Sequence, residues 1–125
     1  MVRITRFEDI HGWQKARTLA KAIYALTANG TFSKDFALRD QIRKASVSVM
    51  ANIAEGFRRR SSKEFANFLF IAHGSAAEIQ SHLYVALDQK YISSDDFASL
   101  YSLAEETSML IKGLYNAVLR RGSTK

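Results

Sequence analysis

Glutamates in this sequence could ligate a di-iron centre, but their spacing does not fit one. Such a centre in a helical bundle needs glutamates on facing helices and two Glu-x-x-His motifs, so that both ligands of a motif share one helix face. Here the third residue after Glu78 is Ser81, and the third after Glu55 is Arg58. The ligand set is incomplete, and we expect no metal site.

The other groups capable of chemistry are isolated from one another. His73 and His82 are nine residues apart and His11 stands near the N-terminus, so we expect each at the surface or in ordinary packing. Gly-rich phosphate loops, nucleophile elbows and His-Glu-x-x-His motifs are absent from the sequence. Thiol catalysis is excluded because the chain has no cysteine. We therefore expect no catalytic residue, no cofactor and no enzymatic activity.

Polar residues around position 53 lie near the apolar stripe of a predicted helix. Asn52 and Glu55 flank Ile53 and Ala54, and a carboxylate buried there must be paired or hydrogen-bonded to stay charged. We expect a polar network that fixes the register between helices, with a functional pocket as the alternative. Gly56 and Gly74 lower helix propensity, and we expect them to permit close helix approach. The network's expected members are Arg43, Asn52, Glu55, Ser75 and Glu78.

Four long helices are the elements that must position these groups. Proline is absent, where average usage of about 5% would supply roughly six residues, and a chain without proline suits uninterrupted helices. Apolar residues recur at alternating spacings of three and four in four segments, which is typical of helices that face a core. The predicted helices span about 9–28, 34–58, 62–90 and 94–121.

Turn and cap residues separate these segments. Asn29-Gly30 favours a left-handed stop, and Ser61 and Ser93 are each followed three residues later by an acidic residue, as in a capping box. Short connections make each helix fold back on its predecessor. We predict an all-α, up-down-up-down antiparallel four-helix bundle, with residues 1–125 forming a single domain.

Length and composition agree with a globular protein. The chain has 125 residues, of which 47% are hydrophobic and 24% charged, and this is enough to bury one core. The first residues lack the apolar segment of a signal peptide, and no run of about 18 apolar residues occurs. The absence of cysteine fits a reducing compartment. We expect a cytoplasmic protein that does not associate with membranes.

The net charge of +6 is unevenly distributed. Residues 10–63 hold eleven basic and three acidic residues (+8), and residues 64–125 hold five basic and seven acidic residues (−2). In an up-down-up-down bundle, the turn between the second and third helices lies at the same end as both chain termini. That end would gather Arg3, Arg6, Arg58, Arg59, Arg60, Lys63, Arg120, Arg121 and Lys125.

These basic residues have two interpretations. Cations are favoured near helix C-termini, and solvated charge is common on any surface, so the arginines could simply stabilise helix ends. Compensation of helix dipoles does not require nine basic groups at one end, whereas binding to phosphates needs cations that converge. We therefore expect this end to contact the backbone of RNA or DNA. The expected binding groups are Arg3, Arg6, Arg58, Arg59, Arg60, Lys63, Arg120 and Arg121.

Apolar residues also lie outside the core stripes. Phe70 and Tyr84 are two heptads apart on the third helix, and Tyr101 and Tyr115 have the same spacing on the fourth. A helix that is apolar on more than one face either crosses a larger core or contacts another subunit. In so small a bundle we expect these four residues to form an oligomer interface.

A motif runs through the predicted second helix. Residues 41–48 read Gln-Ile-Arg-Lys-Ala-Ser-Val-Ser, and residues 52–57 read Asn-Ile-Ala-Glu-Gly-Phe, with Arg59 following. Matching stretches accompany it at residues 7–10 (FEDI), 13–16 (WQKA), 63–65 (KEF) and 74–75 (GS) with Glu78. On these residues, and over nearly the whole chain, the sequence resembles the bacterial 23S rRNA intervening-sequence protein family, also called the S23-type family.

The resemblance implies a four-helix bundle that assembles as a homopentamer and is associated with RNA without being an enzyme. Many members are encoded within insertions in large-subunit ribosomal RNA genes. A similar protein is the accessory factor of diversity-generating retroelements, which binds nucleic acid and a reverse transcriptase. We expect a homo-oligomer whose basic surface contacts RNA or DNA backbone. The alternative is a protein-protein adaptor whose cations meet an acidic partner such as a reverse transcriptase.

Overall fold

The computed structural model describes residues 4–123, and its helices occupy the predicted segments. The α-helices are α1 (His11–Leu26), α2 (Phe36–Phe57), α3 (Ser62–Asp88) and α4 (Ser94–Ser123). Two short 3-10 helices, η1 (Phe7–Asp9) and η2 (Phe32–Lys34), precede α1 and α2. These bounds differ from the predicted ranges by less than one helical turn. The all-α class is confirmed, since the described residues contain no strand.

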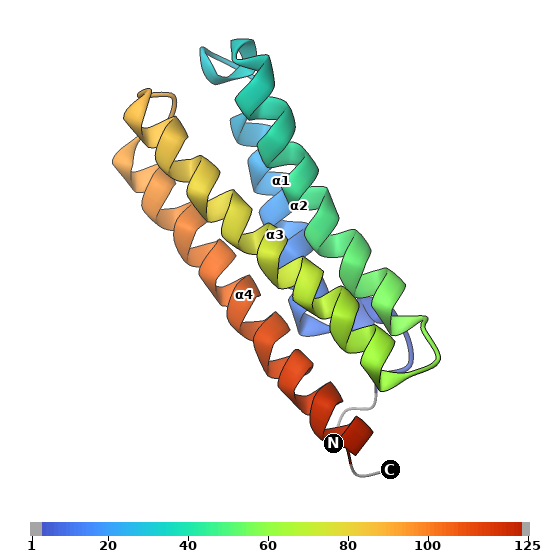
Figure 1. The fold of residues 1–125 in the computed structure, drawn as a ribbon. Helices are drawn as coiled ribbons and strands as arrows, with labels where there is room; N and C mark the ends of the chain where they lie inside the picture. The colour runs from blue at the N-terminus through green and yellow to red at the C-terminus, as the bar shows by residue number, and fades with distance from the viewer. Residues whose placement is uncertain (1–3, 124–125) are drawn as a thin grey trace.

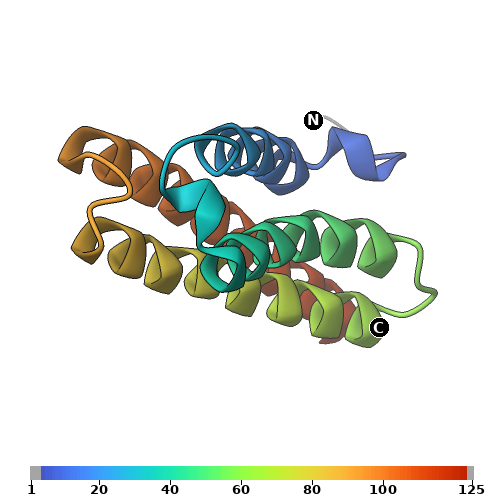
Figure 2. The same ribbon diagram turned by 90° about the horizontal axis from the view of Figure 1, so that it is seen from above.

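Successive helices run in opposite directions and lie side by side (Figure 1). The α2–α3 turn lies at the same end of the bundle as η1 and the last turn of α4, whereas the α1–α2 and α3–α4 connections lie at the other end (Figures 1 and 2). We call the first end, formed by residues 6–9, 55–64 and 120–122, the basic end. The opposite end, formed by residues 27–35 and 89–93, is the far end.

The core is built from the predicted apolar stripes. Each helix contributes side chains that are essentially inaccessible to solvent, including Leu19, Ile42, Leu69, Ile79 and Ile111. Burying an aliphatic side chain of this size contributes roughly 1.5–3 kcal/mol, so these stripes hold the four helices together. Between residues 4 and 123, no helix is both long and apolar enough to span a membrane.

Side-chain caps define where the helices begin. The Glu64 amide donates to Ser61 Oγ at 3.1 Å, and the Asp96 amide donates to Ser93 Oγ at 3.0 Å, which confirms both predicted caps. Gly30 has a φ of +70°, as the predicted left-handed stop requires. The cap of α2 was not predicted: there the Leu38 amide donates to Asp35 Oδ1 at 3.1 Å.

Asp35 also ties the two connections of the far end together. The Tyr91 hydroxyl, from the α3–α4 connection, donates to Asp35 Oδ2 at 2.9 Å, and the Tyr91 ring stacks on the buried Phe32 ring at a centroid distance of 5.3 Å. The hydrogen bond to this carboxylate raises the pKa of the Tyr91 hydroxyl above its usual value, because it stabilises the protonated phenol. One carboxylate therefore caps α2 and fastens the neighbouring loop.

The two glycines predicted to allow close helix approach behave differently. A Cβ on Gly56 would lie 2.7 Å from Phe68 Cβ and 3.3 Å from the Phe65 carbonyl oxygen, so α2 and α3 meet there only because residue 56 lacks a side chain. That prediction is confirmed. For Gly74 it is wrong within the bundle, because a Cβ there would meet nothing within 4 Å. Gly74 faces outward on α3.

Gly56→Ala should therefore lower the free energy of unfolding by about 1–3 kcal/mol, because the added methyl group overpacks the α2–α3 contact. Urea unfolding followed by circular dichroism measures the change. Gly113→Ala is the matched control, since a Cβ on this α4 glycine meets nothing within 4 Å. It should raise the free energy of unfolding by about 0.5–1 kcal/mol through helix propensity alone. Equal effects of the two substitutions would contradict the close contact at Gly56.

Candidate nucleic-acid interface

Three chain segments converge at the basic end. The Arg58 guanidinium carbon lies 5.9 Å from the centroid of the Phe7 ring, which places the N-terminal η1 beside the α2–α3 turn. A Cβ on Gly122 would lie 3.0 Å from Ser62 Cβ, so the last turn of α4 packs against the first turn of α3. The fold-back order of the helices thus brings together groups that are more than a hundred residues apart in sequence, as between Phe7 and Gly122.

Basic side chains outnumber acidic ones at this end. Exposed cations of the described residues are Arg6, Arg58, Arg59, Arg60, Lys63, Arg120 and Arg121. Four acidic residues accompany these seven, namely Glu8, Asp9, Glu55 and Glu64, which leaves a difference of 7 − 4, or +3. Arg3 and Lys125, which belong to the predicted group, lie outside the described residues. The structure therefore brings the described members of the predicted set together.

Arg6 and Arg59 are each paired with a carboxylate. Arg6 Nη2 lies 2.7 Å from Glu8 Oε2, and Arg59 Nη2 lies 2.7 Å from Glu55 Oε2. The hydrogen bond from Arg6 lowers the pKa of the Glu8 carboxyl and raises that of the Arg6 guanidinium, because each charge stabilises the other. Both pairs are exposed, and ion pairs in water contribute little. A polyanion can therefore compete with these carboxylates for the arginines.

Aromatic rings support two arginines of the α2–α3 turn, a feature that was not predicted. Besides Arg58 over Phe7, the Arg59 guanidinium carbon lies over the Phe68 ring, 4.8 Å from its centroid. A shallow, open hollow of about 450 Å³ adjoins both arginines on the outer side of α2 and is lined by Ala51, Ala54, Glu55, Arg58 and Arg59. The sequence does place Phe68 on the helix that follows Arg59. Which side chains meet across a turn depends on the turn's geometry, however, so this contact could not be predicted.

The predicted polar network exists only in part. Asn52 Nδ2 donates to the Ser48 carbonyl oxygen at 2.8 Å and to Ser48 Oγ at 3.0 Å, and Ser48 Oγ lies 2.9 Å from the buried Ser75 Oγ. Asn52 and Ser75 therefore link α2 to α3 through Ser48, which was not among the predicted members. Glu55 was wrongly expected to be buried, since it is exposed and bonds to Arg59 one turn later. Glu78 is also exposed, on the outer side of α3.

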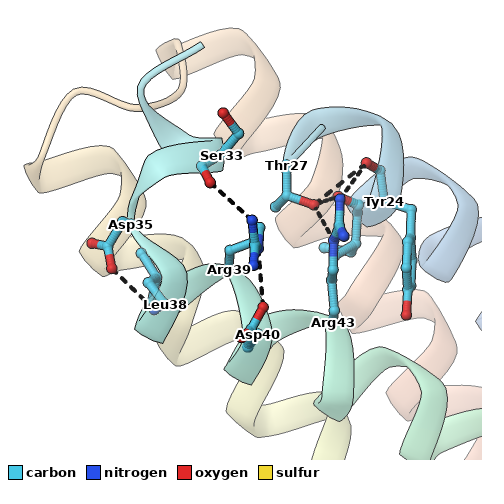
Figure 3. A network of polar contacts seen from close by, with 9 residues as sticks. Tyr24, Thr27, Ser33, Asp35, Leu38, Arg39, Asp40 and Arg43 are labelled. Carbon is cyan, nitrogen blue, oxygen red and sulfur yellow. Dashed lines mark hydrogen bonds and ion pairs between the residues drawn. The ribbon is translucent and has the colours of Figure 1, made fainter. Parts of the chain in front are cut away.

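Arg43 was wrongly assigned to that network, because its side chain reaches back to the end of α1 (Figure 3). Arg43 Nε donates to Thr27 Oγ1 at 2.7 Å, and the guanidinium carbon lies over the Tyr24 ring, 4.5 Å from its centroid. Thr27 is fully buried and donates in turn to the Ile23 carbonyl oxygen at 2.8 Å. Arg43 thus fastens α1 to α2 near the far end and does not belong to the cations that could contact a polyanion.

The four aromatic residues of the predicted interface lie along one side of α3 and α4. Phe70 is 68% exposed and Tyr84 is 51% exposed, whereas Tyr101 and Tyr115 are half-buried against the core. Phe70 packs against Tyr115 at a centroid distance of 6.4 Å, and Tyr84 packs against Tyr101 at 5.8 Å. Tyr101 and Tyr115 therefore serve mainly to hold α3 against α4, and Phe70 and Tyr84 present the outer apolar surface.

A group of three or more potential metal ligands does not occur anywhere in residues 4–123. His11 is exposed, while His73 and His82 on α3 are partly buried, and His82 Nε2 has no hydrogen-bond partner. His11 therefore lies at the surface, and His73 and His82 lie in the packing around α3, as expected from the sequence.

The fold and the basic end together define a small helical bundle with clustered cations at one end and exposed aromatic residues along one side. The chain belongs to the 23S rRNA-intervening sequence protein family, whose model matches residues 8–113. A search of curated proteins finds no match. A crystal structure of a protein of unknown function from the S23 ribosomal protein family of Bacteroides thetaiotaomicron is similar, with a TM-score of 0.77 and 26% identity over 83% of this chain and 97% of that one.

Thr27→Val should lower the free energy of unfolding by about 1–3 kcal/mol, because it removes the hydroxyl that bonds to a charged guanidinium while keeping the side-chain volume. Chemical denaturation measures this loss. Thr18→Val is the control: Thr18 is an exposed α1 residue that bonds only along its own helix, and its replacement should change stability by less than about 0.5 kcal/mol. An undiminished effect of Thr27→Val in an Arg43→Met background would show that the bond between the two side chains does not contribute to stability.

Proposed function

We propose that this protein is a non-enzymatic, self-associating protein whose basic end binds the phosphate backbone of RNA or DNA. The observation that carries the proposal is the convergence of exposed cations from three chain segments at one end of the bundle. Each phosphate neutralised by such a cation releases condensed counterions, which favours binding at low salt. The family name, which refers to 23S rRNA, agrees with a polyanionic partner of this kind.

Among the described residues, no element is placed to read the edges of bases. This supports contact with the nucleic-acid backbone over recognition of a base sequence. The cations lie on a turn and at helix ends, so no exposed recognition helix projects from this end to enter a groove (Figures 1 and 2). Phosphate contacts position a protein on nucleic acid but carry no sequence information by themselves. The proposed binding is therefore tolerant of sequence.

Self-association is supported by the outer face of α3. The adjacent pair Phe70 and Ile71 is exposed, and a second adjacent pair, Tyr84 and Val85, is exposed about four turns later on the same helix. Gly74 lies between these pairs with open space above it, so a neighbouring helix could approach closely there. A ring of copies, a pentamer as the family resemblance suggests, would present several basic ends at once. Avidity would then strengthen individually weak phosphate contacts.

Replacing Arg58, Arg59 and Arg60 together by Ala should weaken binding to RNA and flatten its salt dependence. For the native protein, the logarithm of the affinity should fall linearly with the logarithm of salt concentration. Removal of each cation that neutralises a phosphate should reduce the slope by about 0.7–0.9. Fluorescence anisotropy with RNA and DNA oligonucleotides across salt concentrations measures both quantities.

The control is a triple variant in which Lys21, Lys34 and Lys44 are replaced by Ala. These lysines are exposed toward the far end, and their replacement removes the same net charge. It should keep the native slope. Absence of binding by the native protein at low salt would contradict the proposal and would favour an acidic protein as the partner of these cations.

Phe70→Glu should reduce the molar mass of the protein in solution, because a charge buried without a partner destabilises an apolar interface. Multi-angle light scattering measures the mass, and circular dichroism checks that the helices persist. Phe36→Glu is the control, since Phe36 is 65% exposed but lies at the start of α2, away from the aromatic side of α3 and α4. A native protein that is monomeric at micromolar concentrations would contradict self-association.

A further inference from the structure

Consecutive arginines of the α2–α3 turn are each held over a phenylalanine ring from another element. Arg58 lies over Phe7 of η1, and Arg59 lies over Phe68 of α3. Arg59 is fixed a second time by its 2.7 Å bond to Glu55, yet its side chain remains 40% exposed. A cation that serves only as a point charge, as the ammonium of an exposed lysine does, needs no such support.

Support by a ring orders a guanidinium group before a ligand arrives. The group is planar and delocalised, so one face can rest on an aromatic ring while the opposite face remains available for stacking. Because the side chain is already ordered, less conformational entropy is lost on binding. Guanidinium planes of this kind are among the surfaces on which the unpaired bases of RNA stack.

Space for a base exists beside the two arginines. Ala51 and Ala54 precede them on the outer side of α2, and their small side chains leave the open hollow of about 450 Å³ that Glu55, Arg58 and Arg59 also line. A planar ligand placed in this hollow would therefore lie beside both arginines. The bases of a duplex are stacked within the helix and cannot enter such a hollow, whereas those of a single strand can.

Three other arginines, Arg17, Arg39 and Arg43, also lie over rings but are not equivalent. Arg17, 6.0 Å from the Trp13 centroid, is exposed on α1 but lies outside the basic end. Arg43 lies over Tyr24 and is bound to Thr27 (Figure 3). Arg39 donates to the Ser33 carbonyl oxygen and to Asp40 (Figure 3), and it lies over the Phe36 ring. Both are half-buried and fasten the α1–α2 connection. Arg58 and Arg59 differ because they are exposed and lie within the cluster of cations at the basic end.

We propose that Arg58 and Arg59 stack on unpaired nucleobases, so that the basic end takes single-stranded nucleic acid in preference to a polyanion of equal charge without accessible bases. This inference rests on the proposed binding of nucleic acid backbone and adds a base-stacking contribution to it. Stacking of this type is tolerant of sequence, because every base has a π face.

The test uses three probes with the full chain: an unstructured single-stranded RNA, an abasic strand of equal length and charge, and the same RNA annealed to its complement. The native protein should bind the intact single strand roughly tenfold more tightly than the abasic strand. The double variant Arg58→Lys with Arg59→Lys keeps both charges but removes both planes. It should lose most of that tenfold preference while keeping its affinity for the abasic strand and the duplex.

Arg17→Lys is the matched control, because Arg17 is also an exposed arginine over a ring, 6.0 Å from the Trp13 centroid, but lies on α1 outside the basic end. It should leave all three affinities unchanged. Equal binding of the intact and abasic strands by the native protein would overturn base stacking and leave the charge-based proposal standing. A double variant that weakens all three probes equally would assign the arginines to phosphate recognition and would also overturn it. Failure of the native protein to bind any probe would defeat both proposals.

Discussion

The close approach of α2 and α3 at Gly56 is the constraint on which the basic end depends. Because residue 56 has no side chain, Phe68 and the backbone at Phe65 can pack directly against α2 just before it ends. The chain then reverses within four residues, 58–61, and the three arginines of this turn are exposed. They project into solvent and, in two cases, rest on rings of neighbouring elements. A wider helix separation would need a longer connection and would spread the same charges apart.

Clustering of like charges is unfavourable in the folded bundle, and the structure offsets it by two means. Carboxylates at Glu8 and Glu55 pair with Arg6 and Arg59, and phenylalanine rings lie beneath Arg58 and Arg59. Neither means buries the cations, so the charge stays accessible to a partner. Because the ion pairs are exposed, exchanging a carboxylate for a phosphate requires little desolvation. The cations of the basic end are therefore partly compensated and remain exposed to solvent.

The fold was predictable from the sequence because helical periodicity and caps report on local structure. Ile42 and Leu69 face the core as their stripes require, and Ser61 caps α3. Side-chain partners were less predictable, since periodicity gives the face of a helix but not what a long side chain reaches. Arg43 extends back to Thr27 on α1, and the contact between Asn52 and Ser75 passes through Ser48, a residue type too common to signal its role. The location of the basic end followed from topology alone, whereas the rings beneath its arginines depend on the turn's geometry.

Arginines on α2 and in the turn that follows it have opposite roles according to the end of the bundle at which they lie. Near the far end, Arg43 donates to Thr27 and the Tyr24 carbonyl oxygen, and the connections there are further fastened by the Tyr91 bond to Asp35. These contacts hold α1 and the α3–α4 connection against α2. They therefore secure the order of the helices at the far end, opposite the clustered cations. At the basic end, by contrast, the arginines of the turn remain exposed. Exposed guanidinium groups, which would destabilise a core if buried in it, therefore lie at the end where tight packing at Gly56 already closes the hairpin.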